Sequence, residues 1–349
     1  MAAGITNQRN ILVWLPSPLG DVVLCTPALR AIRNCLADGK VYFFSSSAAA
    51  HLLSPCQFND EWLIQQTNSP FAIAKALRRR KFSQAIFFKN SFASALAVFL
   101  AGVPSRIGYA REARGPLLTD KLYPPREQNG KYKSISMIDY YLAIASWMGG
   151  DTADRSLQLE IDQNKTKQLC DKLSAVATCT TPIIILVPGG AFGPSKCWLP
   201  DRYAKTADWL VENYNATVVI SVAPNPVEKK IANQICQSSK HKLLSLADTP
   251  LGLGELKSLF SLSELVITND TGPRHIAIAL QRKVITLFGP NDPARTETGY
   301  ENEMQIVPDV DCAPCQRKKC NKPEHLCMKA ITVEEVCNAA SQLLDNTRG

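Results

Sequence analysis

The stretch ILVWLPSPLGDVVLCTPALRAIRNCL, residues 11–36, predicts how the first half of the chain folds. Its apolar run Ile11–Leu15 predicts a buried β-strand, and the Pro, Ser and Gly residues at 16–20 predict a loop. From Asp21 onward apolar residues recur at helical spacing, so a helix is expected directly after the loop. Thr26-Pro27 is typical of a helix start, which indicates a break in that helix.

A second stretch with the same plan begins at Ile183. A strand at 183–187 is followed by a loop at 188–200 and by helical sequence to residue 213. Further strands are expected at residues 218–222, 265–268 and 284–288, alternating with helical segments. Strands that alternate with helices favour parallel sheets built from βαβ units. We therefore expect an α/β chain of two doubly wound domains, with the join near residues 171–182.

Length and composition are those of an ordinary globular protein. At about 100–200 residues per domain, 349 residues suggest two domains. No apolar run reaches the roughly 18–20 residues that span a bilayer, and the first ten residues lack the features of a signal peptide. We therefore expect a cytoplasmic protein whose 12 cysteines are mostly reduced.

The net charge of +8 is unevenly distributed. Residues 75–133 contain 13 Lys and Arg against three acidic residues, and the rest of the chain contains 26 basic and 28 acidic residues. Such a stretch is either a solvated basic face or a surface that binds an anionic partner. Its densest part, Arg78–Lys81, lacks a recognised nucleic-acid-binding helix or aromatic platform, so binding to nucleic acid is not expected.

The loop after the strand at 183–187 has the composition of a phosphate-binding loop. Gly189, Gly190 and Gly193 permit a close approach of the backbone, and Ser195 and Lys196 would suit a diphosphate. The spacing differs from that of a Walker loop. The alternative is an ordinary Gly/Pro turn with a surface lysine.

The segment Thr268–Leu280 predicts a second anion site. Pro273 suits the first turn of a helix that starts near Gly272, and the N–H groups at that end would attract an anion, with Thr271 adding a hydroxyl. Alternatively, Asp270 forms an Asx-type turn that caps the helix, and His275 is a half-buried structural histidine.

Asp21 lies where the first strand gives way to a helix. Its carboxylate is a candidate general base, because it can accept the proton of a hydroxyl that attacks as a nucleophile. The alternative is an acidic residue in the first turn that complements the helix dipole.

Four cysteines, Cys312, Cys315, Cys320 and Cys327, lie within sixteen residues. They could form a structural zinc site, although the second pair lacks the usual C-x2-C spacing. Reduced structural thiols are the alternative.

Taken together, these segments resemble glycosyltransferase family 9, the ADP-heptose:lipopolysaccharide heptosyltransferases. The resemblance extends over almost the whole chain, and the cysteine cluster is similar to the branch closest to heptosyltransferase II. The motifs that carry it are Gly20-Asp21, Thr26-Pro27-Ala-Leu29, Arg106-Ile-Gly-Tyr109, Pro188-Gly-Gly-Ala191 with Gly193-Pro-Ser-Lys196, Asn269-Asp-Thr-Gly-Pro-Arg-His275, Leu287-Phe-Gly-Pro290 and Cys327-Met328.

The resemblance implies a GT-B fold, in which two Rossmann-like domains face each other across a cleft. Residues 1–172 would bind the acceptor, residues 180–330 would bind the ADP-sugar, and residues 331–349 would form a helix that returns to the N-terminal domain. Asp21 would be the catalytic base and Lys196 would neutralise the diphosphate. The remaining donor residues would be Gly189, Gly190, Ser195, Glu228, Asp270, Thr271, Gly272 and His275.

The implied reaction is an inverting transfer of heptose from ADP-heptose to the inner core of lipopolysaccharide, an anionic lipid A–Kdo/heptose acceptor at the cytoplasmic face of the inner membrane. No divalent metal or other cofactor would be required, since Lys196 and backbone amides would hold the leaving group. A different nucleotide-sugar, or a non-catalytic nucleotide-sugar-binding protein, are the alternatives. The expected acceptor residues are Arg78, Arg79, Arg80, Lys81, Arg106, Arg111 and Arg114.

Overall fold

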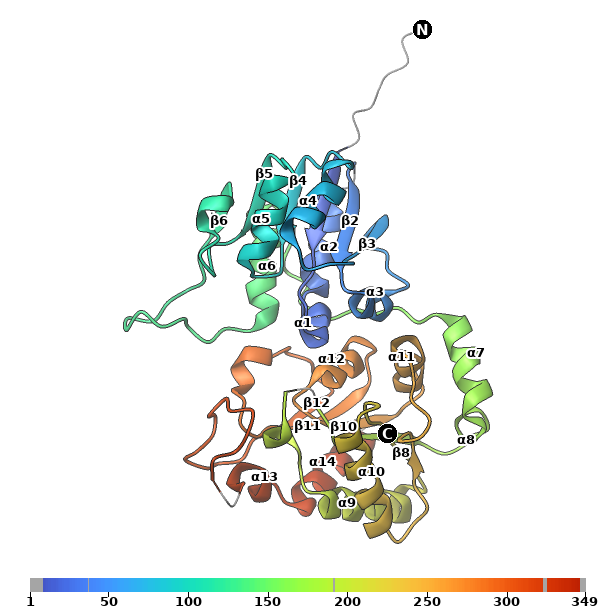
Figure 1. Cartoon of the computed structure of the whole chain (residues 1–349). Coiled ribbons are helices and arrows are strands. Elements are labelled where there is room, and N and C mark those ends of the chain that lie inside the picture. The colour runs from blue at the N-terminus through green and yellow to red at the C-terminus, as the bar shows by residue number, and fades with distance from the viewer. Residues whose placement is uncertain (1–8, 37, 191, 323–324, 346–349) are drawn as a thin grey trace. The chain divides into compact units, whose positions relative to one another are not determined.

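A computed structural model describes residues 9–36, 38–190, 192–322 and 325–345. The described residues exclude the first eight residues of the expected N-terminal domain and the last four, 346–349, of the expected C-terminal helix. They also exclude Ala191 of the glycine-rich loop. The chain divides into two compact units, Met1–Gln158 and Leu159–Gly349 (Figure 1). Each unit is described by itself.

The first unit is a six-stranded parallel sheet covered by helices. Its strand order is β3-β2-β1-β4-β5-β6, and every adjacent pair is parallel. The elements are β1 (Asn10–Trp14), α1 (Leu19–Leu24), α2 (Thr26–Cys35), β2 (Lys40–Ser45), α3 (Ser47–Leu53), β3 (Glu61–Ile64), α4 (Pro70–Arg78), β4 (Gln84–Phe87), α5 (Phe92–Leu100), β5 (Ser105–Tyr109), η1 (Gly115–Leu117), β6 (Asp120–Leu122) and α6 (Met137–Trp147).

The second unit repeats this topology. Its sheet has the order β12-β11-β10-β7-β8-β9, again with two internal strands where the order reverses. The elements are α7 (Gln163–Lys172), α8 (Ser174–Ala177), β7 (Ile183–Val187), η2 (Pro194–Lys196), α9 (Pro200–Tyr214), β8 (Thr217–Ile220), α10 (Pro226–Ser238), β9 (Leu244–Ser245), α11 (Leu253–Ser261), β10 (Leu265–Asn269), α12 (Gly272–Ala279), β11 (Lys283–Leu287), η3 (Pro293–Thr296), β12 (Glu303–Ile306), α13 (Leu326–Ala330) and α14 (Val333–Asp345).

Both sheets are buried on both faces. In β1, Leu12 and Trp14 pack with α4 and α5 in one core cluster, while the alternate residues Ile11 and Val13 are equally buried on the opposite face. In β7 all five residues are buried. Continuous apolar runs are what a parallel strand covered by helices requires, and this confirms the expected doubly wound α/β fold.

The expected break at Thr26-Pro27 is confirmed. α1 ends at Leu24, and α2 begins at Thr26 with Pro27 in its first turn. The Thr26 hydroxyl donates a hydrogen bond to the Val23 main-chain oxygen across the break.

The expected domain boundaries need correction. The units divide between Gln158 and Leu159, so the segment 159–172 belongs to the second unit instead of the first. The physical reason is its packing: the Thr166 hydroxyl bonds to that of Ser258 at 3.0 Å, and Lys257 Nζ donates to the Glu160 main-chain oxygen at 2.8 Å.

The expectation that the last helix returns to the N-terminal domain is also wrong. α14 packs against α9, β11 and β12, and its buried residues belong to the core of the second unit. Only two residues separate α13 from α14, and Cys327 and Met328 of α13 are themselves part of that core. The short link keeps α14 on the second unit. Among the described residues, no helix combines the length and the apolar character needed to cross a bilayer.

Candidate active site

The loops that follow β7 and β10 lie side by side in the second unit. The two strands are parallel neighbours, with Thr268 opposite Val187, so the chain leaves both at the same edge of the sheet. The strand order reverses between them, and open parallel sheets bind ligands at such a point. The structure therefore brings together the two segments that the sequence assigned to a donor site.

Lys196 and Asp270 form a buried ion pair between these loops. Lys196 Nζ lies 3.1 Å from Asp270 Oδ2 and also donates to the Asp270 main-chain oxygen. The two side chains are 8% and 4% exposed. Burial lowers the pKa of Lys196, and the Asp270 charge acts in the opposite direction. The sequence indicated both residues but not their pairing.

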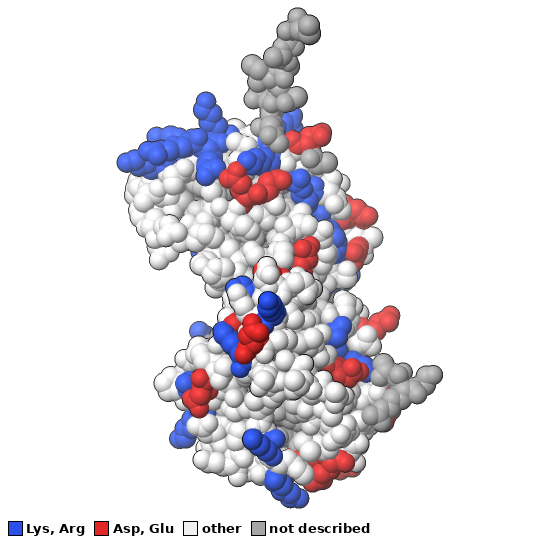
Figure 2. Space-filling model, turned by 90° about the vertical axis from the view of Figure 1, so that its right-hand side faces the viewer, with Lys and Arg blue, Asp and Glu red and all other residues white. Residues whose placement is uncertain are grey.

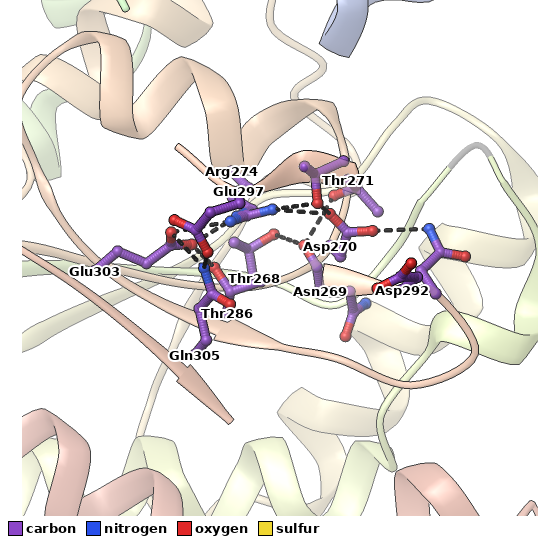
Figure 3. Close-up of polar contacts among 12 residues, drawn as sticks. Thr268, Asn269, Asp270, Thr271, Arg274, Thr286, Asp292, Glu297, Glu303 and Gln305 are labelled. Carbon is purple, nitrogen blue, oxygen red and sulfur yellow. Dashed lines mark hydrogen bonds and ion pairs between the residues drawn. The ribbon is translucent and has the colours of Figure 1, made fainter. Parts of the chain in front are cut away.

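Asp270 is held by four side-chain donors, one of which, Arg274, is labelled in Figure 3. Oδ1 accepts hydrogen bonds from Arg274 Nη1 and Thr296 Oγ1, both at 3.1 Å. Oδ2 accepts from Asn291 Nδ2 at 2.8 Å as well as from Lys196. Burial alone would raise the pKa of Asp270, but the Lys196 and Arg274 cations hold it well below its ordinary value. A direct contact of this carboxylate with an ADP-sugar stays a prediction.

The start of α12 is suited to an anion. Thr271 is the N-cap residue but its side chain makes no cap hydrogen bond; the hydroxyl donates to the Asn269 main-chain oxygen instead. The helix therefore begins at Gly272 with its positive end in the loop. His275, one turn on, is buried, and burial together with Arg274 lowers its pKa to about 3, so the imidazole is neutral. Its Nδ1 has no partner among the described residues.

The glycines of the β7 loop sit where a side chain would not fit. A Cβ at Gly189 would lie 2.1 Å from Glu228 Oε2, and one at Gly190 would lie 2.5 Å from Thr271 Cγ2. The same Glu228 oxygen accepts a hydrogen bond from the Ala223 main-chain nitrogen at 2.8 Å. Glu228 and Thr271 thus both lie against the glycine-rich loop, and a contact of either with an ADP-sugar stays a prediction.

Ser195 ties this loop to the cysteine-rich segment. Its hydroxyl donates to the Arg317 main-chain oxygen at 2.6 Å, and His325 Nε2 lies 2.7 Å from the Ser195 main-chain oxygen. In the structure this hydroxyl therefore anchors the loop, and a contact with the diphosphate stays a prediction.

The cysteine-rich segment borders a cavity of about 330 Å³. Its lining consists of Ser195, Pro290, Cys312, Cys315, Arg317, Cys320, Asn321, Lys322, His325 and Cys327. All twelve cysteines are free thiols. Within the part of the chain that the structure describes, no three His, Cys, Asp or Glu side chains are grouped as metal ligands would be. The described residues therefore do not form the zinc site considered from the sequence.

Asp21 occupies the corresponding position in the first unit. The strand order reverses between β1 and β4, and Asp21 lies in the first turn of α1, directly after β1, where it is partly exposed. Burial raises the pKa of Tyr141, and the nearby Asp21 charge adds to this effect. Lys89, which the sequence did not indicate, follows β4; its main-chain nitrogen donates to the Trp14 oxygen, and burial lowers the pKa of its ammonium group.

Two of the expected acceptor arginines, Arg106 and Arg114, direct most of their hydrogen bonds to main-chain oxygens. Arg114 is fully buried, and it donates to the main-chain oxygens of Tyr109 and Lys89 and to Asn90 Oδ1. This corrects its assignment to the acceptor, because no face of the guanidinium reaches solvent. Arg106 directs its donors to the Leu117, Val103 and Pro104 oxygens, which leaves it partly exposed but tied to the backbone.

The other expected acceptor residues lie nearer the surface. Arg78, Arg79, Arg80 and Lys81 are exposed, and Arg111 is partly exposed. Arg80 pairs with Glu61 at 2.9 Å, and Arg111 stacks on Tyr132 at 4.5 Å. Arg79 and Lys81 therefore remain the best candidates to receive an anion directly.

Sequence reasoning missed Asn291, Thr296 and Glu303, which complete the polar network around Asp270. Asn291 directly follows Leu287-Phe-Gly-Pro290, so the motif itself was a signal. Glu303 lies in an ordinary polar segment and gave none.

Comparisons with known proteins point to one family. The family model described as glycosyltransferase family 9 (heptosyltransferase) matches residues 71–325. Lipopolysaccharide heptosyltransferase 2 of Escherichia coli is 28% identical over 299 residues, covering 81% of this chain and 84% of that protein. Lipooligosaccharide heptosyltransferase 2 of Campylobacter jejuni is 23% identical over 343 residues, covering 97% and 99%.

The fold is shared with a solved structure, that of E. coli ADP-heptose lps heptosyltransferase II. The TM-score is 0.80 at 23% identity, with 97% of this chain and 100% of that chain covered. The two six-stranded parallel sheets are those of the GT-B fold. With a family model that matches most of its length, this chain belongs to glycosyltransferase family 9 and is a transferase.

Proposed function

We propose that this protein moves heptose from ADP-heptose to the inner core of lipopolysaccharide. The observation that carries the proposal is the site at the ends of β7 and β10, where Lys196 and the start of α12 lie together. A nucleoside diphosphate is the kind of anion that a buried lysine and a helix N-terminus complement. The relatives named heptosyltransferase 2 support heptose as the transferred sugar, and the solved structure of E. coli ADP-heptose lps heptosyltransferase II supports ADP-heptose as the donor.

The proposed reaction is a single displacement. The oxygen of an acceptor hydroxyl forms a bond to the anomeric carbon of the heptose, and Asp21 takes the hydroxyl proton. The bond from that carbon to the diphosphate oxygen breaks, and its electron pair leaves with ADP. Attack opposite the leaving group inverts the anomeric centre.

Lys196 and the amides of α12 are the groups proposed to stabilise the charge that grows on the leaving diphosphate. Preorganised donors in a buried site contribute most when they need no reorientation during the reaction. Lys196 meets this condition, because two hydrogen bonds to Asp270 fix its ammonium group. No step of this scheme uses a divalent cation, so heptose transfer is expected to proceed in the presence of a chelator.

The first unit is proposed to receive the anionic lipid acceptor at the inner-membrane surface. Figure 2 shows Lys and Arg side chains gathered at one end of that unit. On α4, Phe71 is 71% exposed, and the exposed Lys75 and Arg78 follow one and two turns further along the helix. An exposed aromatic ring beside cations favours contact with an anionic membrane surface.

The test uses the purified protein with ADP-heptose, EDTA and a lipid A–Kdo acceptor with or without a heptose already attached, and measures ADP release. Asp21→Asn should lower turnover by about 10²- to 10⁴-fold, the usual contribution of a general base, while calorimetry finds the Kd of ADP unchanged. Asp38→Asn, at an exposed position of the same unit, is the matched control and should behave as the wild type.

Other outcomes assign the alternatives. Unchanged turnover in Asp21→Asn would remove Asp21 as the base. Release of a different nucleotide from a panel of nucleotide-sugars would change the donor. Binding of ADP-heptose without release under any condition would indicate a non-catalytic binding protein.

A further inference from the structure

We propose that Arg274 and Glu303 are positioning residues, which act through Asp270 to hold the Lys196 ammonium group in place for the donor diphosphate. The inference rests on the proposed function, because that function assigns Lys196 its task. The contact of Arg274 and Glu303 with Lys196 is indirect and runs through the two oxygens of the Asp270 carboxylate.

Arg274 uses both sides of its planar guanidinium (Figure 3). Nε and Nη2 donate to Glu303 Oε1 and Oε2 at 2.6 and 2.9 Å, and Nη1 donates to Asp270 Oδ1 at 3.1 Å. The first two bonds form the bidentate arrangement that fixes an arginine in direction as well as position. The third bond therefore points at Asp270 from a defined place.

The Glu303 carboxylate is held in turn by hydrogen bonds from side chains of the sheet. Its Oε1 accepts a hydrogen bond from Thr286 Oγ1 at 2.5 Å, and its Oε2 accepts one from Gln305 Nε2 at 3.2 Å. Thr286 lies on β11 and Glu303 and Gln305 lie on β12, which are paired strands. The line of contacts therefore begins on the sheet edge and ends at Lys196.

The arrangement also balances charge. The Glu303 and Arg274 side chains are 2% and 0% exposed, and those of Asp270 and Lys196 are 4% and 8% exposed. Arg274 faces one Asp270 oxygen, so Lys196 has to neutralise only part of that carboxylate. Without Arg274, the full Asp270 charge would fall on Lys196 and would weaken its attraction for a phosphate.

If Arg274 is a positioning residue, its effect on turnover can be separated from its effect on the thermal stability of the protein. Arg274→Met alone leaves Glu303 buried without its cation and should lower the thermal midpoint. Arg274→Met/Glu303→Gln removes both charges, while the introduced side-chain amide keeps hydrogen-bonding groups for Thr286 and Gln305, so the midpoint should recover toward the wild type. Turnover should nevertheless stay lower by about tenfold or more, because Asp270 has lost its support. Arg282→Met, at a second arginine of the same unit, is the control and should retain turnover.

The decisive experiment is a double-mutant cycle with a Lys196→Ala/Asp270→Asn background, which removes the ammonium group together with the carboxylate through which Arg274 acts. In the wild-type background, the paired change should weaken ADP binding several-fold in calorimetry and reduce turnover by about tenfold. In the Lys196→Ala/Asp270→Asn background it should have no further effect on either quantity. Recovery of turnover together with stability, or equal losses in both backgrounds, would overturn the proposal. The ADP-binding arm needs no acceptor, so it decides the positioning role even if the wild type binds ADP and transfers no heptose, an outcome that would reject only the proposed function.

Discussion

In the first unit, most of the cations between Lys75 and Lys133 lie at the surface, whereas Lys196 and Arg274 of the second unit are buried beside carboxylates. Both units nevertheless have a six-stranded parallel sheet, and Asp21 of the first unit, like Lys196 and Asp270 of the second, follows a strand next to which the strand order reverses. The common topology therefore provides a position for a ligand, but it does not determine whether buried or exposed cations neutralise the charge of that ligand.

The difference suggests a division of labour. A buried, paired cation such as Lys196 keeps one orientation and needs little reorganisation when charge develops beside it. Exposed cations such as Arg79 and Lys81 are screened by water and salt, and they suit the attraction of a large anionic partner. The proposed donor and acceptor sites thus match the two kinds of environment.

Among the cations of the two units, the largest expected effect is that of removing the buried ammonium group. Lys196→Met should reduce turnover by about 10²- to 10³-fold, which is the usual effect of removing one electrostatic stabiliser of a transition state. Lys205→Met, at an exposed lysine of the same unit, should leave turnover within a factor of about two of the wild type. Steady-state ADP release measures both. A similar loss of turnover in the two variants would mean that buried and exposed lysines of this unit do not differ in their contribution to the reaction.

A second prediction concerns pH. The pKa of His275 is about 3 in the folded protein and about 6.5 in an unfolded chain, so the unfolded state binds more protons between these values. Stability should therefore fall as pH is lowered from about 6.5 toward 3, by at most about 1.4 kcal/mol per pH unit from this group.

Denaturant unfolding of the wild type and of His275→Gln at several pH values tests this. The variant should show a shallower decline, whereas His51→Gln, at an exposed histidine, should reproduce the wild-type slope. Identical slopes in all three proteins would mean that His275 is not held neutral.

The smallest expected effect is on the exposed cations. Arg79→Ala/Lys81→Ala should raise the KM for the acceptor several-fold and reduce its dependence on salt, while the KM for ADP-heptose is unchanged. Lys205→Ala/Lys230→Ala removes two exposed charges from the second unit and is the matched control. Titration of the acceptor at two salt concentrations gives these values. An equal rise in the KM for both substrates would indicate a structural role for the pair.

The framework of the molecule could be predicted because its decisive residues are local. Ile11–Leu15 and Ile183–Val187 are continuous apolar runs followed by glycine-containing loops, and parallel strands buried on both faces produce this pattern. The positions of Asp21, Lys196 and Asp270 relative to these strands followed directly from it.

The remaining features depend on contacts between distant segments. Nothing in the sequence around Arg114 distinguishes it from its exposed basic neighbours, since its partners are Asn90 and two main-chain oxygens. Glu303 is 29 residues from Arg274, with which it pairs, and the final helix has an apolar face that would fit either unit. Such pairings are set by tertiary packing, which periodicity does not encode.

The buried Arg274–Glu303 contact also has a consequence for how β12 can assemble. β12 is a short strand at the sheet edge, with Glu303 opposite Val284 and Met304 opposite Ile285. A slip of one residue would turn the Glu303 carboxylate away from Arg274 and present the Met304 side chain in its place. That alternative would leave a buried guanidinium facing a thioether. The ion pair therefore specifies a single register for the edge strand β12.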